Sequence, residues 1–489
     1  MPQCGTFVSV PDEKCKNVTL STFLLVRLVL ISRQMWSDRV NSQNNAATTL
    51  AHAAARTNWP TCPAIVRTKL LHLVLDAIAV IAGAANHATM KSLAAQIAPH
   101  DGPSTFIAEK RGGSTRETIL LNAATTTVLQ RQDGYAHAKG HPASQLVPVL
   151  LALAERGEAE PERMLSAIMA GYEVGARVGI ALGGVPPWLH DNGNWATIGT
   201  AAGAAHFLSD GDETVIEAAI DGAASLALSF DRFTTAAGAT MHHLYPAMAT
   251  THALAVAEGA AAGLTSLPGS LEQFYGPRLG AAFEDDKLIE CINDGAWSQY
   301  EILNGYFKLH PSCAHLHGVN DAVETMIAQH SITEDQIERV DVATFGEAME
   351  IDSPAPCNDL AARFSAKATV AAAIRHGSLT DDGLLDLGAL APLMEKITAK
   401  HDPDLDQHIP EGRPGVVRIT LTDGHCVEHT VIHPRGTPKV NATEEERRGK
   451  ALLLLGQHYG ENGAIEVETA VMALGETGTI AEVTAAMRR

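Results

Sequence analysis

The stretch "AIVRTKLLHLVLDAIAVIAGAA", residues 64–85, predicts a buried α-helix and indicates the class of the fold. Its apolar residues recur at steps of three and four and end near Gly83, as they do along a buried helix. "ERMLSAIMAGYEVGARVGIAL" (162–182) and "IGTAAGAAHFL" (198–208) continue the pattern with closely spaced small residues, which let neighbouring helices approach closely. From about Asn45 to Gly263 the sequence therefore predicts one helical bundle.

Strand-like runs enter the sequence after about residue 271. "IERVDVATF" (337–345) alternates apolar and polar residues as a half-buried strand does. "GVVRITLTDGHCVEHTVIH" (415–433) holds two such runs joined at Asp423-Gly424, a strong signal for a β-hairpin. Helical stretches lie between these runs, so residues 271–436 are predicted to form a smaller α+β domain.

The C-terminal segment is helical again after "PRGTPKVNATEEERRGKALLLLG" (434–456) and is expected to rejoin the bundle. The predicted fold is therefore mainly α: residues 45–270 and 437–489 form a large all-helical domain, into which the α+β domain is inserted. Residues 1–44 are expected to be a separate extension, disordered or weakly helical. Its apolar run at 20–32 is interrupted by Arg27 and is too short to span a bilayer.

The composition narrows the classes of function. A chain of 489 residues favours two domains, and its formal charge of −20 argues against nucleic acid or an anionic membrane as a partner. The seven cysteines are scattered, without a CxxC pair, which fits a reducing compartment: the cytoplasm, or the mitochondrion in a eukaryote. No glycine-rich turn joins a strand to a helix, so a Rossmann domain is not expected.

One predicted connection, which contains glycines, carries an unusual group of polar residues. "QDGYAHAKGHPAS" (132–144) holds Asp133, His137, Lys139 and His141, and Pro142 follows directly. Proline is favoured in the first turn of a helix, where its missing N–H costs nothing. Pro142 is therefore predicted to open the helix "PASQLVPVLLALAE", with His141 beside its N-terminus.

Two further segments also place a proline just after basic or polar residues. Pro246 in "MHHLYPAMATTHALAVAEGAA" (241–261) and Pro311 in "YFKLHPSCAHLHGVNDAVETM" (306–326) are each predicted to open a helix. The residues just before them are His242, His243 and Tyr245 in the first segment, and Lys308 and His310 in the second.

Three helix N-termini with basic or polar side chains suggest a common site. A helix N-terminus presents free N–H donors and about half a positive charge. If the three converge, they form a pocket for a small anion with several carboxylates inside an acidic protein. A zinc or copper site at His310, Cys313, His315 and His317 is the weaker alternative, because residues two apart on a helix do not share a face. A Ser-His-Asp triad is weaker still, since the G-x-S-x-G motif is absent.

The sequence also resembles a known family. In order, it contains "LVLDAIAVIAG", "QDGYAHAKGHPAS…VPVLLALAE", "GTAAGAAHFL", "GATMHHLYPAMA", "YFKLHPSCAHLHGVNDAV", "AARFSAKATVAAAIRHG" and "PRGTPKVNATEEERRGK". These motifs, over about residues 45–485, resemble the MmgE/PrpD family, which includes 2-methylcitrate dehydratase, cis-aconitate decarboxylase and iminodisuccinate epimerase. The resemblance implies a homodimer with an inserted α+β lid. It also implies a cleft that acts on small di- and tricarboxylates without metal or organic cofactor.

The motifs also carry over candidate catalytic residues. Asp133 and His141 match the family's aspartate and its "HP" histidine, and Lys308 matches the lysine before the "P-x-C" helix. Elsewhere the chain departs from the pattern. It reads Trp195-Ala196 where relatives often have histidine, His242 and Tyr245 replace a lysine and a histidine, and Cys313 replaces a histidine of some decarboxylases.

The shared chemical problem is removal of a proton from carbon next to a carboxylate, which needs a base and fixed positive charge. His141 is the expected base, kept neutral by the helix dipole, and Asp133 would orient it or relay a proton. Lys308, with His242 or Tyr245, would hold carboxylates and donate a proton. The further substrate-binding candidates are His137, Lys139, Trp195, His243, His310 and Cys313.

The order of the candidate reactions follows from these residues. A hydro-lyase of the 2-methylcitrate dehydratase kind comes first. An iminodisuccinate-type epimerase and a cis-aconitate decarboxylase-like enzyme follow, and an inactive dimeric scaffold or binding protein is the non-enzyme alternative.

Overall fold

The computed structural model describes residues 45–279 and 283–489, so the predicted extension over 1–44 lies outside the described residues. The fold is mainly α-helical, as the sequence predicts. The long helices of its first half are α2 (Ala46–Ala55), α3 (Ala64–Gly83), α4 (Ala88–Ile97), α5 (Thr115–Thr125), α6 (Ala143–Gly157), α7 (Pro161–Ala181), α8 (Trp195–Ser209), α9 (Glu213–Ser225) and α11 (Leu244–Ala261).

Short elements connect and extend these helices. Up to the end of α11 they are η1 (Trp59–Thr61), β1 (Ser104–Phe106), η2 (Ile107–Glu109), β2 (Arg111–Gly113), β3 (Gly134–Tyr135), α10 (Phe233–Ala236) and η3 (Thr240–His243). After it come η4 (Leu271–Tyr275), α12 (Gly276–Arg278), α13 (Asp285–Ile289), β4 (Ile292–Asn293), β5 (Ala296–Trp297), η5 (Glu301–Asn304) and β6 (Gly305–Tyr306).

Helices α7 and α8 cross at glycines. A Cβ built on Gly199 of α8 would lie 2.4 Å from the Gly171 carbonyl oxygen and 2.7 Å from the Gly175 Cα of α7. The small residues noted in the sequence therefore allow backbone-to-backbone packing, as predicted. This crossing fixes the connection between the two helices, residues 182–194, which contributes to the candidate site.

A second hydrophobic core, separate from that of the bundle, surrounds a four-stranded sheet of order β10-β9-β7-β8. The strands are β7 (Ile337–Thr344), β8 (Ile397–His401), β9 (Gly415–Leu421) and β10 (Cys426–Val431). The predicted hairpin is β9–β10, which pair antiparallel around Gly424, a residue with a φ of 86°. Strand β8 pairs parallel with β7, and the chain between them is largely helical.

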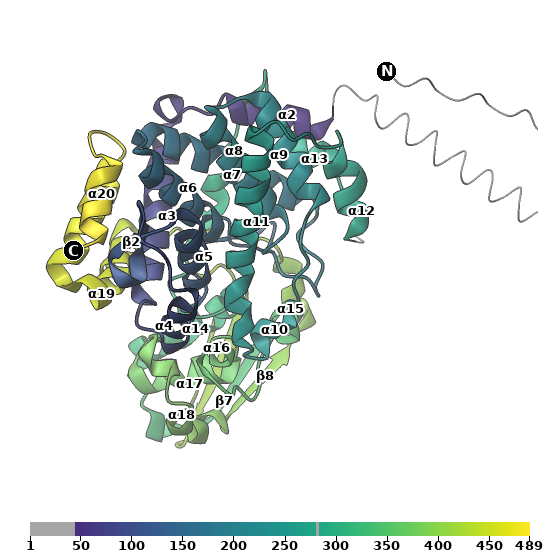
Figure 1. The fold of residues 1–489 in the computed structure, drawn as a ribbon. Helices are drawn as coiled ribbons and strands as arrows, with labels where there is room; N and C mark the ends of the chain where they lie inside the picture. The colour runs from purple at the N-terminus through teal and green to yellow at the C-terminus, as the bar shows by residue number, and fades with distance from the viewer. Residues whose placement is uncertain (1–44, 280–282) are drawn as a thin grey trace, which may run out of the picture.

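The helices of this second core lie below the bundle in Figure 1. The helical elements of this part of the chain are η6 (Ala314–Leu316), α14 (His317–His330), η7 (Glu334–Gln336), α15 (Gly346–Glu350), α16 (Asp359–Ala362), α17 (Ala366–His376), η8 (Asp382–Leu384), α18 (Leu387–Met394) and η9 (Pro403–His408). Of these, α14, α16, α17, η8 and α18 supply residues to the second core. The predicted smaller unit starts at residue 271, but Leu271, Trp297 and Phe307 pack in the core of the bundle. The second core begins only with Val319.

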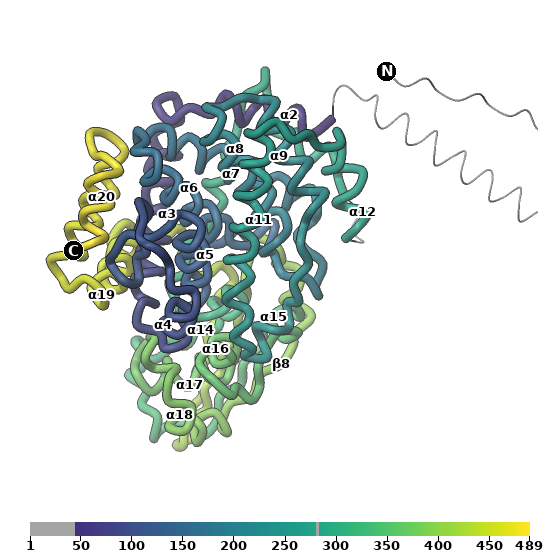
Figure 2. The backbone as a smooth tube through the Cα atoms, in the orientation of Figure 1, coloured from purple at the N-terminus to yellow at the C-terminus, as the bar shows by residue number. Residues whose placement is uncertain are grey.

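The C-terminal helices α19 (Glu444–Ala473) and α20 (Ile480–Met487) pack back onto the first half of the chain, beside α3 (Figures 1 and 2). Lys450 of α19 places its Nζ 2.6 Å from an Asp76 carboxylate oxygen of α3 and 2.7 Å from the Arg131 carbonyl oxygen. All three residues are buried. Helix α19 is thus tied both to α3 and to the segment that leads to Asp133.

The observed first residues of the helices agree with two of the three predicted helix starts to within two residues and disagree with the third. Helix α6 begins at Ala143, one residue after Pro142, and α11 begins at Leu244, two residues before Pro246. The third prediction is wrong: after Pro311 the chain stays irregular until η6, and α14 begins only at His317. Lys308 and His310 therefore lie in a connection rather than at a helix N-terminus. Across the described ranges, every helix is too short or too polar to span a lipid bilayer.

Candidate active site

A cavity of about 80 Å³ lies where the bundle meets the second core. Its polar and charged lining residues are Gln130, Lys139, His141, His190, Asp191, Arg232, Thr235, Tyr306, Lys308, Cys313, His315 and Arg413. Its apolar lining residues are Val185, Leu189, Ala314, Ile351 and Phe364. Two of the three predicted segments, around His141 and around Lys308, therefore meet at one cavity, which we call the basic cavity.

Short strand pairing brings these two segments together. Strand β3 pairs antiparallel with β6, so that Gly134 lies opposite Tyr306. A Cβ on Gly134 would lie 2.1 Å from the Tyr306 ring, so only glycine allows this approach. The pairing places Asp133 and His141 on one side of the junction and Lys308 on the other.

His141 is oriented as a base. Its Nδ1 lies 2.6 Å from the backbone carbonyl oxygen of Asp133. A carbonyl oxygen only accepts hydrogen bonds, so Nδ1 carries the proton and Nε2 keeps a free lone pair. Burial, followed by the charge of Lys308, lowers the pKa of His141 to about 4. The ring is therefore neutral at physiological pH, as predicted, but burial rather than a helix dipole is the principal cause.

Asp133 is not among the residues that line the basic cavity, but it holds the position of His141. One carboxylate oxygen accepts the N–H of Ala143, the first residue of α6, at 3.2 Å. The other oxygen is buried and has no hydrogen-bond partner among the described residues. Burial raises the pKa of Asp133 to about 7. The residue orients His141 through its backbone, while its carboxylate holds the start of the helix.

Buried positive charge characterises the basic cavity. Lys308 is 1% exposed and Arg413 is 5% exposed. Burial lowers the pKa of Lys308 to about 8, so its amine is still protonated at pH 7. Arg413 donates to the carbonyl oxygens of Pro410 and Gly412, at 2.8 and 2.6 Å. Neither Lys308 nor Arg413 forms an ion pair with a carboxylate of the described residues.

Further donors surround these cations. Arg232 donates to Nε2 of His315 at 2.9 Å, which leaves the buried Nδ1 of His315 protonated and without a partner among the described residues. Lys139 also lines the cavity, but its amine is paired with Glu347. Asp191 is the single carboxylate among the described residues that line the cavity. The site is therefore electropositive within an acidic protein.

Cys313 lines the cavity as well, and burial raises the pKa of its thiol. Its neutral sulfur adds no charge.

His242 and Tyr245 do not line the cavity. His242 is buried behind it, with ring nitrogens 3.3 Å from Nε2 of Gln130 and 3.2 Å from the Thr235 hydroxyl. Because both partners line the cavity, His242 supports its wall.

Tyr245 is also engaged elsewhere. Its hydroxyl donates to the Asp231 carbonyl oxygen at 3.1 Å, and its ring stacks on Phe230 with centroids 4.5 Å apart. The catalytic contact expected of Tyr245 is therefore not seen, because its hydroxyl is directed to the backbone. The same holds for Trp195, whose buried indole donates to the Ala138 carbonyl oxygen at 3.1 Å and packs against Gly140.

Two predicted substrate-binding histidines face other neighbours. His243 points to the Thr127 hydroxyl, 3.1 Å from its Nδ1, and packs near His87. His137 is partly exposed, with its Nε2 3.3 Å from a Glu411 carboxylate oxygen. Neither lines the basic cavity.

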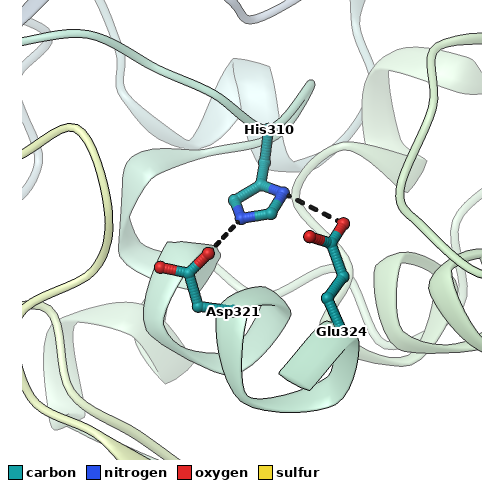
Figure 3. A group of neighbouring side chains, drawn as sticks. All are labelled: His310, Asp321 and Glu324. Carbon is teal, nitrogen blue, oxygen red and sulfur yellow. Dashed lines mark hydrogen bonds and ion pairs between the residues drawn. The ribbon is translucent and has the colours of Figure 1, made fainter. Parts of the chain in front are cut away.

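His310 lies in a separate ion-pair cluster (Figure 3). Its Nε2 is 2.8 Å from an Asp321 oxygen, and its Nδ1 is 3.5 Å from a Glu324 oxygen. These three residues have the composition of a metal site. However, Arg435 already donates to Asp321 at 2.9 Å and to Glu324 at 2.8 Å, so a guanidinium neutralises both carboxylates. The arrangement is that of a structural ion-pair network rather than of a substrate site.

Several lining residues were not predicted from the sequence as parts of this site. His190 and Asp191 lie in "PPWLHDNGN" (186–194), before α8, and Arg232 and Arg413 lie in connections without a recognisable motif. His315 was considered only as a metal ligand. The adjacent His190-Asp191 pair was a usable signal, because a carboxylate often orients an imidazole.

Two models of one protein family and a protein of Aspergillus oryzae are similar to this chain. A model of the MmgE/PrpD N-terminal domain matches residues 48–287, and a model of the MmgE/PrpD C-terminal domain matches residues 310–474. The cis-aconitate decarboxylase-like protein oryM of Aspergillus oryzae (strain ATCC 42149 / RIB 40) is 24% identical over 479 residues. This alignment covers 88% of the present chain and 95% of that protein.

Proposed function

The chain belongs to the MmgE/PrpD family, and from this membership we propose that it is a lyase acting on a small di- or tricarboxylate. Its own side chains supply the base and the positive charge that the reaction needs. The family supports a lyase or dehydratase type of activity, and the basic cavity supports the class of substrate.

The observation that carries the proposal is the unpaired positive charge of the basic cavity. A buried charge is costly unless it is paired. Lys308 and Arg413 are buried without a carboxylate partner among the described residues, and Arg232 contributes a third cation. A substrate with two or three carboxylates supplies the missing counter-charges. A neutral substrate would leave them uncompensated.

The arrangement of His141 supports proton abstraction next to a carboxylate. Its Nε2 has a free lone pair, because Nδ1 is committed to the Asp133 carbonyl. Proton removal places negative charge on the neighbouring carboxylate oxygens, which Lys308 and Arg413 stabilise. The pKa of His141, about 4, makes it a weak base in the free protein, and a polyanion bound beside it strengthens the ring as a base.

Dehydration is the reaction that we propose first. After the carbon-bound proton moves to His141, the hydroxyl on the adjacent carbon leaves as water, once it has received a proton. Decarboxylation is the second candidate, favoured by the similarity to the cis-aconitate decarboxylase-like protein of A. oryzae. Both reactions use the same cations to hold the substrate and differ in the group that leaves.

A substrate panel tests the proposal. Citrate, 2-methylcitrate, cis-aconitate and iminodisuccinate are incubated with the protein in heavy water and followed by proton NMR. Loss of the carbon-bound proton with a new alkene signal indicates dehydration, and loss of a carboxylate carbon as carbon dioxide indicates decarboxylation. Deuterium uptake without elimination indicates epimerisation. No binding and no exchange with any of the four acids would contradict the proposed function and favour a scaffold.

A further inference from the structure

We propose that His190, held by Asp191, is the general acid that protonates the departing hydroxyl group. This inference rests on the proposed dehydration and assigns its second proton transfer to a residue in the connection between α7 and α8. His190 then acts as the general acid, and His141 acts as the general base.

The first support is the position of His190. Both His190 and Asp191 line the basic cavity. The His190 backbone N–H donates to the Phe230 carbonyl oxygen at 2.9 Å, and the Asn194 side chain donates to the His190 carbonyl oxygen at 2.7 Å. The connection is thus tied on both sides of the histidine, which holds the imidazole at the cavity wall.

The second support is the carboxylate partner. Nδ1 of His190 lies 2.9 Å from an Asp191 oxygen. Burial opposes ionisation of Asp191, yet its contacts with His190 and His141 lower its pKa to about 2. The Asn192 backbone N–H donates to the same Nδ1 at 3.2 Å, and the Asn192 side-chain nitrogen lies 3.1 Å from it, so Nδ1 accepts a hydrogen bond while the imidazole is neutral. When the imidazole is protonated, the Asp191 carboxylate becomes the acceptor for Nδ1, and in either state Nε2 is the ring nitrogen left to exchange a proton with the substrate.

The contrast with His141 assigns the two roles. Nδ1 of His141 faces an uncharged carbonyl oxygen, whereas Nδ1 of His190 faces an anion. The Asp191 carboxylate can balance the charge of an imidazole that arrives protonated, whereas the Asp133 carbonyl leaves a neutral ring, so the geometry makes His190 the acid and His141 the base. Asp191 also links them, because its second oxygen accepts the His141 backbone N–H at 3.0 Å.

The surroundings of His190 are mixed in charge. From its own segment it faces Asp191, and from the segment after α9 it faces Asp231. The ring of His242 lies at 5.0 Å and that of Tyr245 at 5.5 Å, measured between centroids. The other charged or titratable groups that share the cavity are Lys139, His141, Arg232, Tyr306, Lys308, Cys313, His315 and Arg413.

The proposed step balances without a co-reactant. The carbon–hydrogen bond breaks and its proton goes to Nε2 of His141, while its electron pair forms the new double bond. The carbon–oxygen bond breaks with its electron pair on oxygen, which takes the proton from Nε2 of His190 and leaves as water. Exchange with solvent then removes the proton from His141 and returns one to His190.

A change of leaving group tests this assignment. Fluoride leaves without a proton, so 2-methylcitrate is compared with its analogue in which fluorine replaces the hydroxyl. His190→Gln is expected to slow the hydroxy acid by about 100-fold or more and the fluoro analogue by less than about 5-fold. Asp191→Asn, which removes the orienting charge, is expected to show a smaller difference in the same direction.

The controls separate this inference from the proposed function. The comparison uses whichever hydroxy acid of the panel the wild type dehydrates, and a wild type that dehydrates none of them contradicts the proposed dehydration, whatever His190 does. If the wild type is active, equal slowing of both compounds, or slowing of neither, would overturn the role of His190. Circular dichroism checks that the variant folds, and His190→Asn provides the same comparison if His190→Gln does not.

Discussion

The imidazole of His141 is oriented by the backbone of Asp133, whose carbonyl oxygen lies 2.6 Å from Nδ1. The Asp133 carboxylate, by contrast, holds the start of α6 through the Ala143 N–H. One residue thus fixes both the tautomer of the base and the helix that follows it.

The replacement Gly140→Ala should lower activity by roughly 10- to 100-fold, because small displacements of catalytic groups are costly. The added Cβ would lie 2.3 Å from Cζ2 of Trp195 and 2.8 Å from Cβ of Asp191, so the neighbours of His141 must move. Steady-state kinetics measures the effect. Gly157→Ala is the matched control, since its Cβ meets no atom within 4 Å. Equal activity of the two variants would show that the packing at Gly140 does not position the site.

Replacing Lys308 by methionine should weaken binding of the tricarboxylate tricarballylate by about 10- to 100-fold, the range expected for a lost charged hydrogen bond. Calorimetric titration measures the affinity, and Lys439→Met, at an exposed position, is the control. The pKa of Lys308 is about 8, so wild-type affinity should fall as the pH rises above 8 and approach that of the variant. Affinity that does not respond to the substitution would remove Lys308 from the substrate site.

The replacement Asp133→Asn should change how stability depends on pH. Burial raises the pKa of Asp133 to about 7, above its value of about 3.9 in an unfolded chain. The folded state then binds more protons between these values, so wild-type stability decreases as the pH rises from about 4 to 7. Thermal denaturation at pH 5 and pH 8 should show a smaller loss for Asp133→Asn than for the wild type. Identical losses would indicate that Asp133 is already ionised in the folded protein.

A structural role for His310 predicts loss of stability without loss of substrate affinity. His310→Ala leaves Asp321 buried with Arg435 alone, which should lower the free energy of unfolding by about 1 to 3 kcal/mol. Denaturant titration measures this change, and KM for a turned-over acid should stay within about 2-fold of the wild type. A large rise in KM with unchanged stability would return His310 to the substrate site.

The sequence predicted the helical bundle and the β9–β10 hairpin because local patterns determine them. The periodicity of residues 64–85 and the Asp423-Gly424 turn are short-range signals. It also predicted His141 and Lys308 as site residues, and both line the cavity at which the β3–β6 pairing joins their segments. The sequence alone did not reveal this pairing, which joins residues far apart in the chain.

The predicted site residues that the structure places away from the basic cavity share one physical cause. A proline gives no information on the direction of the side chains before it, and after Pro311 the first α-helix begins only at His317. His310 precedes Pro311, yet it turns to Asp321, and His243 turns to Thr127. Conversely, Arg413 and His190 reach the cavity from connections whose course depends on long-range packing. Local patterns hold no information about such convergence.

Solvent exchange at the carbon next to the substrate carboxylate tests the central claim most directly. Wild-type protein and His141→Gln are incubated in heavy water with the acid that the wild type turns over, and proton NMR follows the carbon-bound proton. His137→Ala, outside the cavity, is the control. The account predicts that His141→Gln loses exchange by at least about 100-fold while His137→Ala keeps it. Exchange at the wild-type rate in folded His141→Gln would show that another residue removes the proton.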